Sequence, residues 1–221
     1  MELYLLLLII AIPLIAQSKV KTNYEKFSRI QNSHNMTGYE VARKILDSNG
    51  LTDIKIVQTH GELTDHYDPR QKVIRLSNNI YSKTSISAIA VAAHEVGHAL
   101  QHKEDYSFLK LRTKMVPAVN FTSNISTILI FLGLFLEFTG LLYLSAILMI
   151  ISLAFQFITL PVEFDASSRA KEQLTKLNII TAADNKGVTN VLSAAAFTYI
   201  AGFLATALQI LRYITIAKRN D

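Results

Sequence analysis

The chain has 221 residues, of which 50% are hydrophobic and only 18% are charged, and its mean hydropathy is +0.28. These values argue against an ordinary soluble domain and favour a membrane protein with one modest aqueous portion. The net charge of +5 comes without a dense basic run, so we expect no nucleic-acid binding. Because the chain has no cysteine, disulfides and thiolate metal sites are excluded.

The first apolar segment is an almost unbroken run from Leu3 to Ala16 that contains Pro13. It is short for a membrane-spanning helix, and a cleaved signal peptide is the alternative interpretation. The start, Met1-Glu2, is not basic, and no small-x-small cleavage site precedes Gln17. We therefore favour an uncleaved membrane anchor.

The main polar portion begins with a helix and continues with a small sheet. Thr37-Gly38-Tyr39-Glu40 has the pattern of a capping box, which predicts a helix over 38–48. Residues 54–57 and 72–76 are predicted to be strands, with a turn at Tyr67-Asp68-Pro69-Arg70 between them. An exposed edge of such a sheet could bind a substrate peptide as an added strand.

An apolar helix follows, and it carries the H-E-x-x-H pattern at His94-Glu95-Val96-Gly97-His98. Residues i and i+4 share one helix face, so His94 and His98 can bind one ion. Two neutral imidazoles suit zinc, which acidifies a bound water. Glu95 lies about 100° further round the helix, where it can take a proton from that water as a general base.

Two longer apolar segments, Val116–Leu136 and Phe138–Leu160, are predicted to form a helical hairpin with a tight turn at Glu137–Gly140. A fourth apolar segment, Val191–Leu211, is rich in small residues, which allow close helix packing. It either spans the membrane or lies over the site.

The hairpin would return the chain to the side that carries the two histidines. Pro161 is expected in the first turn of a new helix, with Glu163 near the start of that helix as the third zinc ligand. The alternative is an interfacial glutamate opposed by Arg169 or Lys171. Asp165 is expected either to orient a ligand imidazole or to pair with Arg169 at i+4.

Three other side chains are weaker candidates. His66, near the strand turn, could hydrogen-bond a transition-state oxyanion, or it could belong to a surface loop. Tyr199 could serve the same role, although packing is the simpler interpretation. His102 lies one turn beyond His98, too far along the helix axis for the same ion, and we expect it at the surface or near the ligands.

Four stretches together resemble the YugP family of bacterial membrane zinc metallopeptidases. They are 94–102, Asp65-His66-Tyr67-Asp68-Pro69-Arg70, Val73-Ile74-Arg75-Leu76-Ser77 and Pro161-Val162-Glu163-Phe164-Asp165-Ala166. The resemblance extends over most of the chain and implies a zinc-dependent membrane peptidase.

More distantly, the chain is similar to the membrane gluzincins, which carry their third ligand in a Glu-x-x-x-Asp motif. Here the acid after Glu163 is Asp165, two positions on, and Ser167 stands at the fourth position. This departure leaves Glu163 in place as the implied ligand but moves the acid that would support it.

The sequence thus predicts a mainly α membrane protein with a minimal zincin-type domain, made of a small sheet and the H-E-x-x-H helix, and three to four transmembrane helices. The expected organisation is an anchor at 1–17, the zincin-like domain at 18–115, a transmembrane hairpin at 116–160, the third-ligand helix and loop at 161–190, and a C-terminal apolar helix at 191–213.

The predicted function is that of a zinc metalloendopeptidase acting on a peptide or membrane-protein substrate. Zn²⁺ is expected on His94, His98 and Glu163, with Glu95 as the general base. The alternative is a catalytically silent membrane scaffold or regulator, against which the intact Glu95 argues. An intramembrane protease would need a ligand deep in a distant apolar helix, which the sequence does not offer.

The chain is expected to be a multi-pass protein of the bacterial plasma membrane. Basic residues flank the polar portion at both ends, which favours a metal site on the cytoplasmic side. These residues are Lys19, Lys21, Lys26, Arg29, Lys103, Lys110, Arg112 and Lys114.

Overall fold

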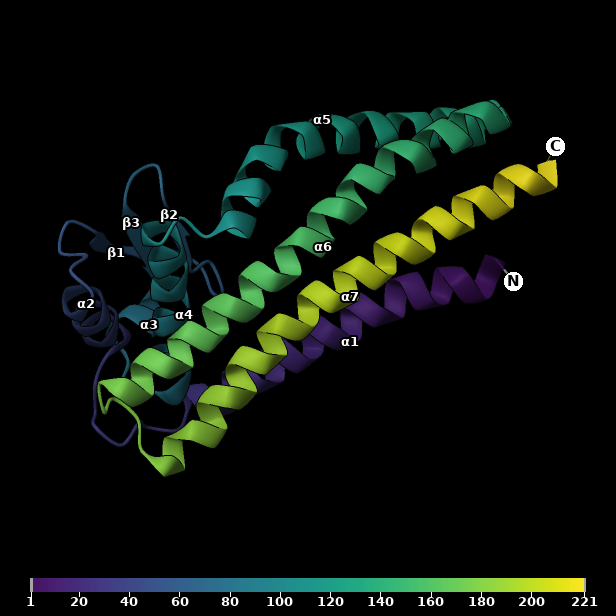
Figure 1. Cartoon of the computed structure of the whole chain (residues 1–221). Helices are drawn as coiled ribbons and strands as arrows, with labels where there is room; N and C mark the ends of the chain where they lie inside the picture. The colour runs from purple at the N-terminus through teal and green to yellow at the C-terminus, as the bar shows by residue number, and fades with distance from the viewer. Residues whose placement is uncertain (1, 221) are drawn as a thin grey trace. The chain divides into compact units, whose positions relative to one another are not determined.

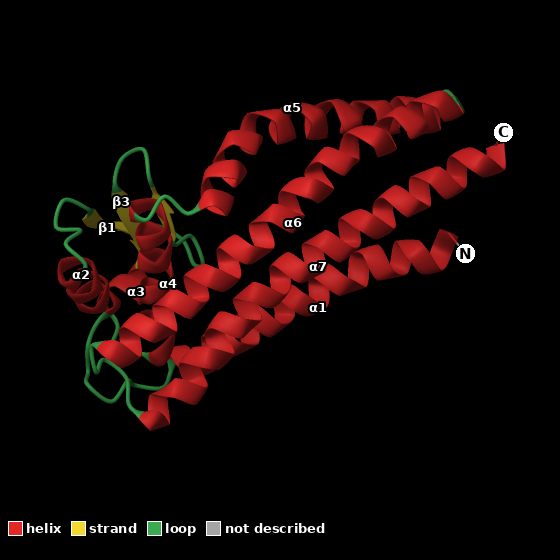
Figure 2. Cartoon of the chain, viewed as in Figure 1, coloured by secondary structure: helices red, strands yellow, loops and turns green. Residues whose placement is uncertain are grey.

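The computed structural model describes residues 2–220, so Met1, the first residue of the expected anchor, lies outside the described residues. Most of the chain is helical, and the strands are few and short (Figures 1 and 2). The elements in chain order are α1 (Glu2–Ser28), α2 (Gly38–Ser48), β1 (Lys55–Thr59), β2 (His66–Asp68), β3 (Val73–Ser77), α3 (Asn78–Ser82), α4 (Ile86–Lys103), α5 (Ser107–Phe135), α6 (Thr139–Lys176) and α7 (Ala182–Asn220).

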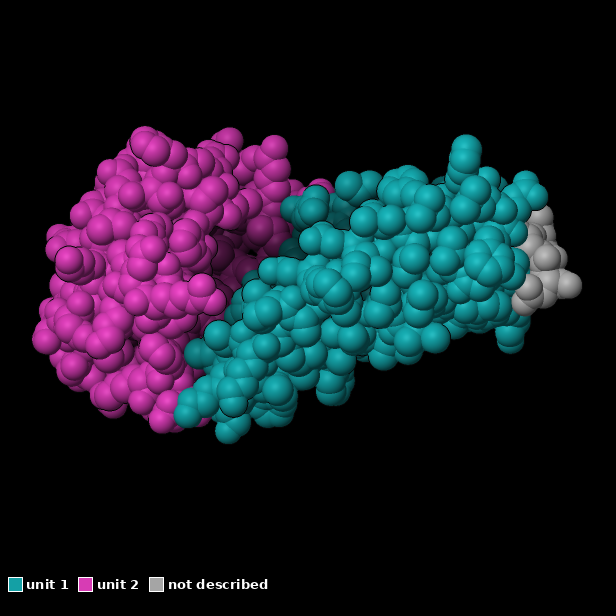
Figure 3. All heavy atoms as spheres, turned by 90° about the horizontal axis from the view of Figure 1, so that it is seen from above, with its two compact units in different colours: residues 1–17, 107–161, 197–221 teal, residues 18–106, 162–196 magenta. Residues whose placement is uncertain are grey.

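The chain divides into two compact units, which Figure 3 colours separately. Unit 1 comprises residues 1–17, 107–161 and 197–221, and unit 2 comprises residues 18–106 and 162–196. The described residues of unit 1 are therefore helical segments and the α5–α6 turn, whereas unit 2 holds the sheet and the H-E-x-x-H helix.

Among the described residues, four helices, α1, α5, α6 and α7, are long and apolar enough to cross a membrane. Many of their large apolar side chains are exposed, as lipid contact requires and water does not favour. Examples are Leu3, Leu7, Leu14, Phe121, Ile128, Phe131, Ile147, Phe157 and Leu204. The protein is thus a mainly α membrane protein with one small sheet, as the sequence predicts.

The N-terminal helix is longer than the apolar run that predicts it. Helix α1 keeps Pro13 in its interior and continues past the run to Ser28. In this last part Lys21 and Glu25 form an i,i+4 ion pair of 3.8 Å, and Phe27 is buried in the core of unit 2. The polar C-terminal part of α1 is thus held by packing within unit 2, and the hydropathy of the sequence does not reveal such packing.

Unit 1 contains the predicted hairpin. Helices α5 and α6 are joined by residues 136–138, and Ser126 donates a hydrogen bond of 2.9 Å from its hydroxyl to the Ser145 carbonyl oxygen of the other helix. A Cβ on Gly133 would lie 2.9 Å from a methyl carbon of Leu142, so the small residue lets the two helices approach closely. Helix α5 begins nine residues before the apolar segment that predicts it.

The expectation that a new helix begins at Pro161 is wrong. Helix α6 runs without a break from Thr139 to Lys176, and Pro161 lies in its interior. A proline there removes one backbone hydrogen bond and costs about 3 kcal/mol in a water-exposed helix. Val162 is fully buried and Ala166 lies against α4, so tertiary packing holds the helix in register across the proline. Glu163 is consequently an interior residue of α6.

The fourth apolar segment is part of an even longer helix. Helix α7 has 39 residues, which corresponds to about 58 Å at the usual rise per residue. That exceeds the roughly 30 Å of a hydrocarbon core. No break interrupts α7 within the described residues, so the helix does not turn back on itself.

The sheet has the strand order β1-β3-β2, with β1 parallel and β2 antiparallel to the central strand. Strands β1 and β3 fall where the sequence predicts them. Strand β2 was not predicted because it has only three residues, and its last two, Tyr67 and Asp68, are the first two residues of the predicted turn. The turn itself is present, since Asp68 accepts a hydrogen bond of 2.9 Å from the backbone N–H of Arg70.

Capping side chains define the starts of helices α2 and α4. The predicted capping box is confirmed, because Thr37 accepts from the Glu40 N–H and Glu40 accepts from the Thr37 N–H. Ser85 caps α4 by accepting a hydrogen bond of 3.1 Å from the Ala88 N–H. Most of α4 is buried, so it is the central helix of unit 2.

Helices α4 and α6 cross in close contact within unit 2. A Cβ built on Gly97 would lie 2.4 Å from the carbonyl oxygen of Ala166, a distance that no real Cβ adopts. The glycine in the middle of the H-E-x-x-H pattern therefore allows the two backbones to meet. Backbone atoms cannot rotate away, so any larger residue must push the helices apart.

Replacing Gly97 by Ala should consequently destabilise the protein by about 1–3 kcal/mol, the usual cost of overpacking a core. The matched control is Gly202→Ala on α7, where nothing lies within 4 Å of an added Cβ. This control should leave the unfolding temperature unchanged or raise it. Thermal unfolding of both variants in detergent tests the contact, and equal behaviour of the two would contradict it.

Candidate metal centre

The central helix presents two imidazoles on one face. His94 and His98 lie at i and i+4 of α4, and their ring centroids are 4.8 Å apart in an edge-on arrangement. Both side chains are nearly buried, with 14% and 12% of their surface exposed. The spacing that predicts a shared ion is therefore realised in the geometry.

Glu163 of α6 faces these two rings. Its Oε2 atom lies 3.3 Å from Nε2 of His94 and 3.5 Å from Nε2 of His98. One donor atom from each of the three residues lies within 4.8 Å of the others, as three ligands of one metal ion must. The residue is 2% exposed, and a carboxylate buried this deeply requires a cation beside it.

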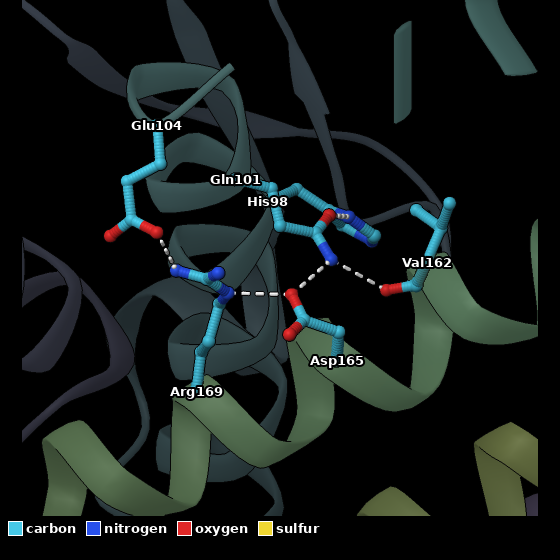
Figure 4. A network of polar contacts seen from close by, with 6 residues as sticks. All are labelled: His98, Gln101, Glu104, Val162, Asp165 and Arg169. Carbon is cyan, nitrogen blue, oxygen red and sulfur yellow. Dashed lines mark hydrogen bonds and ion pairs between the residues drawn. The ribbon is translucent and has the colours of Figure 1, made fainter. Parts of the chain in front are cut away.

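The other nitrogen of each ring is also engaged, by two side chains that sequence reasoning missed. Nδ1 of His94 lies 3.1 Å from Oγ of Ser167, and Nδ1 of His98 lies 3.0 Å from Oε1 of Gln101 (Figure 4 shows the second contact). Partners of this kind orient histidines for metal binding through Nε2. The available signal was helix spacing, since Gln101 is i+3 from His98 and Ser167 is i+4 from Glu163.

Glu95 is buried on the same helix, with 7% of its surface exposed. Burial raises the pKa of its carboxyl group, and the nearby charge of Glu163 raises it further, while His94 and His98 lower it. A raised pKa makes a carboxylate a stronger proton acceptor near neutral pH.

Asp65 lies in the segment before β2 and connects it to the end of β3. Its Oδ1 accepts a hydrogen bond of 2.7 Å from the Ser77 N–H, and burial raises its pKa. The negative charge of Asp65 also raises the pKa of Glu95. The Asp65–Arg70 stretch of the family resemblance thus reaches the neighbourhood of the H-E-x-x-H helix.

Asp165 forms the i+4 pair with Arg169 that the sequence left open, and its connection to a ligand imidazole is indirect. Its Oδ2 accepts a hydrogen bond of 2.5 Å from Nε of Arg169, four residues on. The same oxygen accepts a hydrogen bond of 2.8 Å from Nε2 of Gln101, which in turn contacts His98 (Figure 4). Asp165 therefore reaches a ligand ring only through an intermediate side chain.

Two of the three weaker candidates, His66 and His102, are exposed. His66 is exposed, and its Nδ1 lies 2.8 Å from the Thr64 carbonyl oxygen. His102 is exposed and its Nδ1 lies 2.9 Å from the Tyr67 hydroxyl, as expected for a surface residue. Tyr199 is a residue of helix α7, and its oxyanion role stays a prediction. The oxyanion role of His66 stays a prediction.

A His, His, Glu triad beside a buried glutamate is the donor set of a zinc metallopeptidase, here in a chain with four apolar helices. The family model described as "Putative neutral zinc metallopeptidase" matches residues 2–218. The chain belongs to this family of zinc peptidases.

A curated relative gives the same result. "Putative membrane protease YugP" from Bacillus subtilis (strain 168) is 50% identical over 201 residues, which cover 91% of this chain and 89% of the relative. No solved structure matches the chain. The resemblance to the YugP family that the motifs indicate is therefore confirmed, and zinc is the metal that the family implies.

Proposed function

We propose that the protein is a membrane-bound zinc metalloendopeptidase, with His94, His98 and Glu163 as metal ligands and Glu95 as general base. The observation that carries the proposal is the convergence of three ligand atoms within 4.8 Å, next to a buried carboxylate on the same helix. The substrate class we infer is a peptide or membrane protein.

The reaction follows from what each group can do. Bound zinc supplies a Lewis acid that lowers the pKa of a water molecule and polarises a peptide carbonyl. Glu95 accepts one proton from the attacking water, while the remaining hydroxide bonds to the carbonyl carbon. When the C–N bond breaks, Glu95 delivers that proton to the leaving nitrogen. The products are a carboxylic acid and an amine, and Glu95 returns to its starting state.

A catalytically silent metal-binding scaffold is the competing function. A purely structural zinc site has no use for a buried carboxylate next to a ligand, and burying one is costly. Glu95 occupies this position with 7% exposure. A catalytic role in proton transfer explains why a carboxylate is buried here in spite of this cost.

The position of Glu163 along α6 favours a site at the membrane surface. Glu163 lies 24 residues after Thr139, the first residue of the helix, which corresponds to about 36 Å of helix. A hydrocarbon core is only roughly 30 Å thick. We infer that the apolar part of α6 crosses the bilayer before the chain reaches Glu163.

The basic residues at both ends of the polar portion favour the cytoplasmic side for the site. With α1, α5, α6 and α7 all crossing, both termini would lie outside, although Lys218 near the C-terminus runs against the charge rule. The length of α7 supports full crossing.

Replacing Glu95 by Gln should leave zinc bound but reduce peptide hydrolysis by at least about 100-fold, because the amide cannot accept the proton. Purified protein in detergent can be assayed for bound zinc and for cleavage of a casein substrate. A chelator-treated sample of the parent protein gives the metal-free baseline. If Glu95→Gln cleaved the substrate at the parental rate, the assignment of Glu95 as the general base would be wrong.

Replacing His94, His98 or Glu163 by Ala should each remove a zinc ligand and lower zinc content sharply. Asp165→Ala is the matched control on α6, because it removes a carboxylate two positions from Glu163 that contacts no ring directly. Its zinc content should stay closer to that of the parent. Metal analysis after dialysis decides between the two acids, and a reversed order would make Asp165 the ligand.

Single cysteines at Ile30, Thr139 and Lys218 test the sidedness, since the parent chain has no cysteine to give background. A membrane-impermeant thiol reagent applied to intact cells should label positions 139 and 218 but not position 30. Permeabilised cells control for reactivity at all three positions. Strong labelling of position 30 in intact cells would place the site outside.

A further inference from the structure

Gln101 occupies an unusual position for a polar residue. It lies one helical turn after His98 on α4 and is completely buried, at 0% exposure. Its Oε1 lies 3.0 Å from Nδ1 of His98. A glutamine buried to this extent must satisfy its amide group within the protein.

The two partners of the amide nitrogen fix the orientation of this side chain. Nε2 of Gln101 lies 2.7 Å from the Val162 carbonyl oxygen and 2.8 Å from Oδ2 of Asp165 (Figure 4). A carbonyl oxygen and a carboxylate oxygen can only accept hydrogen bonds. The amide hydrogens must therefore point at these two oxygens of α6, which leaves the amide oxygen for His98.

An ion-pair network keeps Asp165 in place as an acceptor. Arg169 donates from Nε to Asp165 and, with its terminal nitrogen at 2.7 Å, to Glu104 just past the end of α4. The network thus runs from the exposed Glu104 to the nearly buried His98 ring and joins α4 to α6 (Figure 4).

This orientation determines the proton on His98. Because Oε1 of Gln101 only accepts, Nδ1 of His98 must donate and so carries the hydrogen. In a neutral imidazole the lone pair then lies on Nε2, the atom that faces Glu163 at 3.5 Å. We propose that Gln101 is a positioning residue that holds His98 in the tautomer with Nε2 free to bind the metal.

His94 offers an instructive contrast. Its Nδ1 contacts the hydroxyl of Ser167, which can donate or accept. Ser167 therefore leaves the tautomer of His94 open, whereas Gln101 imposes that of His98. Of the two histidines, only His98 has its tautomer imposed by a partner that can act solely as an acceptor.

The inference rests on the proposed metal site, and zinc affinity together with NMR tests it. Gln101→Met keeps the volume and removes the acceptor, so zinc should bind about 10–100-fold more weakly, measured by competition with a chromophoric chelator. The matched control is Gln173→Met on α6, which loses a buried hydrogen bond to Asn49 without contact to a ligand. The control should bind zinc as the parent does.

The spectroscopic readout is the coupling of ¹¹³Cd to ¹⁵N-labelled histidine in cadmium-loaded protein. The parent should show coupling to Nε2 of His98 and a slowly exchanging hydrogen on Nδ1, which Gln101→Met loses. Gln101→Glu retains an acceptor for that hydrogen, so it should retain the Nδ1–H signal although it unfolds at a lower temperature. If Gln101 had only a structural role, the Nδ1–H signal of His98 would behave alike in the two variants. It would be lost from both Gln101→Met and Gln101→Glu, or kept in both.

Three outcomes would overturn the inference. These are coupling to Nδ1 of His98 in the parent, parental zinc affinity in Gln101→Met, or loss of the Nδ1–H signal in Gln101→Glu. The parent spectrum decides even if Gln101→Met does not fold. If neither the parent nor the control binds zinc, the proposed metal site fails instead, which separates the two conclusions.

Discussion

The contact between the backbones of α4 and α6 at Gly97 and Ala166 is the constraint on which unit 2 depends. It sets the distance between the helix that carries His94 and His98 and the helix that carries Glu163. A shift of about 1 Å at this crossing would change the distances from Glu163 to both histidines. The glycine within H-E-x-x-H is therefore a packing requirement of the site, in addition to any role of its neighbours in chemistry.

An unbroken α6 changes how the third ligand is held. A residue at the start of a helix shares the mobility of the loop before it, whereas Glu163 lies in the interior of a 38-residue helix. The same helix carries Ser167, which contacts the His94 ring, and Val162 and Asp165, which contact Gln101 beside the His98 ring. One continuous helix thus carries the proposed ligand Glu163, the Ser167 partner of His94 and the two acceptors that orient Gln101 of α4.

Much of this arrangement could be predicted from the sequence, because it depends on local rules. The i,i+4 histidines, the capping box at Thr37 and the apolar hairpin each follow from a period or a cap. The continuity of α6 through Pro161 and the role of Gln101 could not be predicted in the same way. Both depend on contacts with a neighbouring helix, and such tertiary contacts produce no periodic pattern in the sequence.

The buried negative charges of unit 2 favour a cation between the two histidines and Glu163. Glu95 and Glu163 are both buried on adjoining faces of α4 and α6, and Asp65 adds a third negative charge to the field at Glu95. Neutral imidazoles cannot balance this charge, and buried like charges repel each other strongly. A divalent cation bound by His94, His98 and Glu163 removes the conflict, because it offsets the negative charge where burial makes it most costly. The same arrangement that is unfavourable without a metal therefore favours the binding of a cation, and zinc binding at the proposed site should contribute to the stability of the fold as well as to the chemistry.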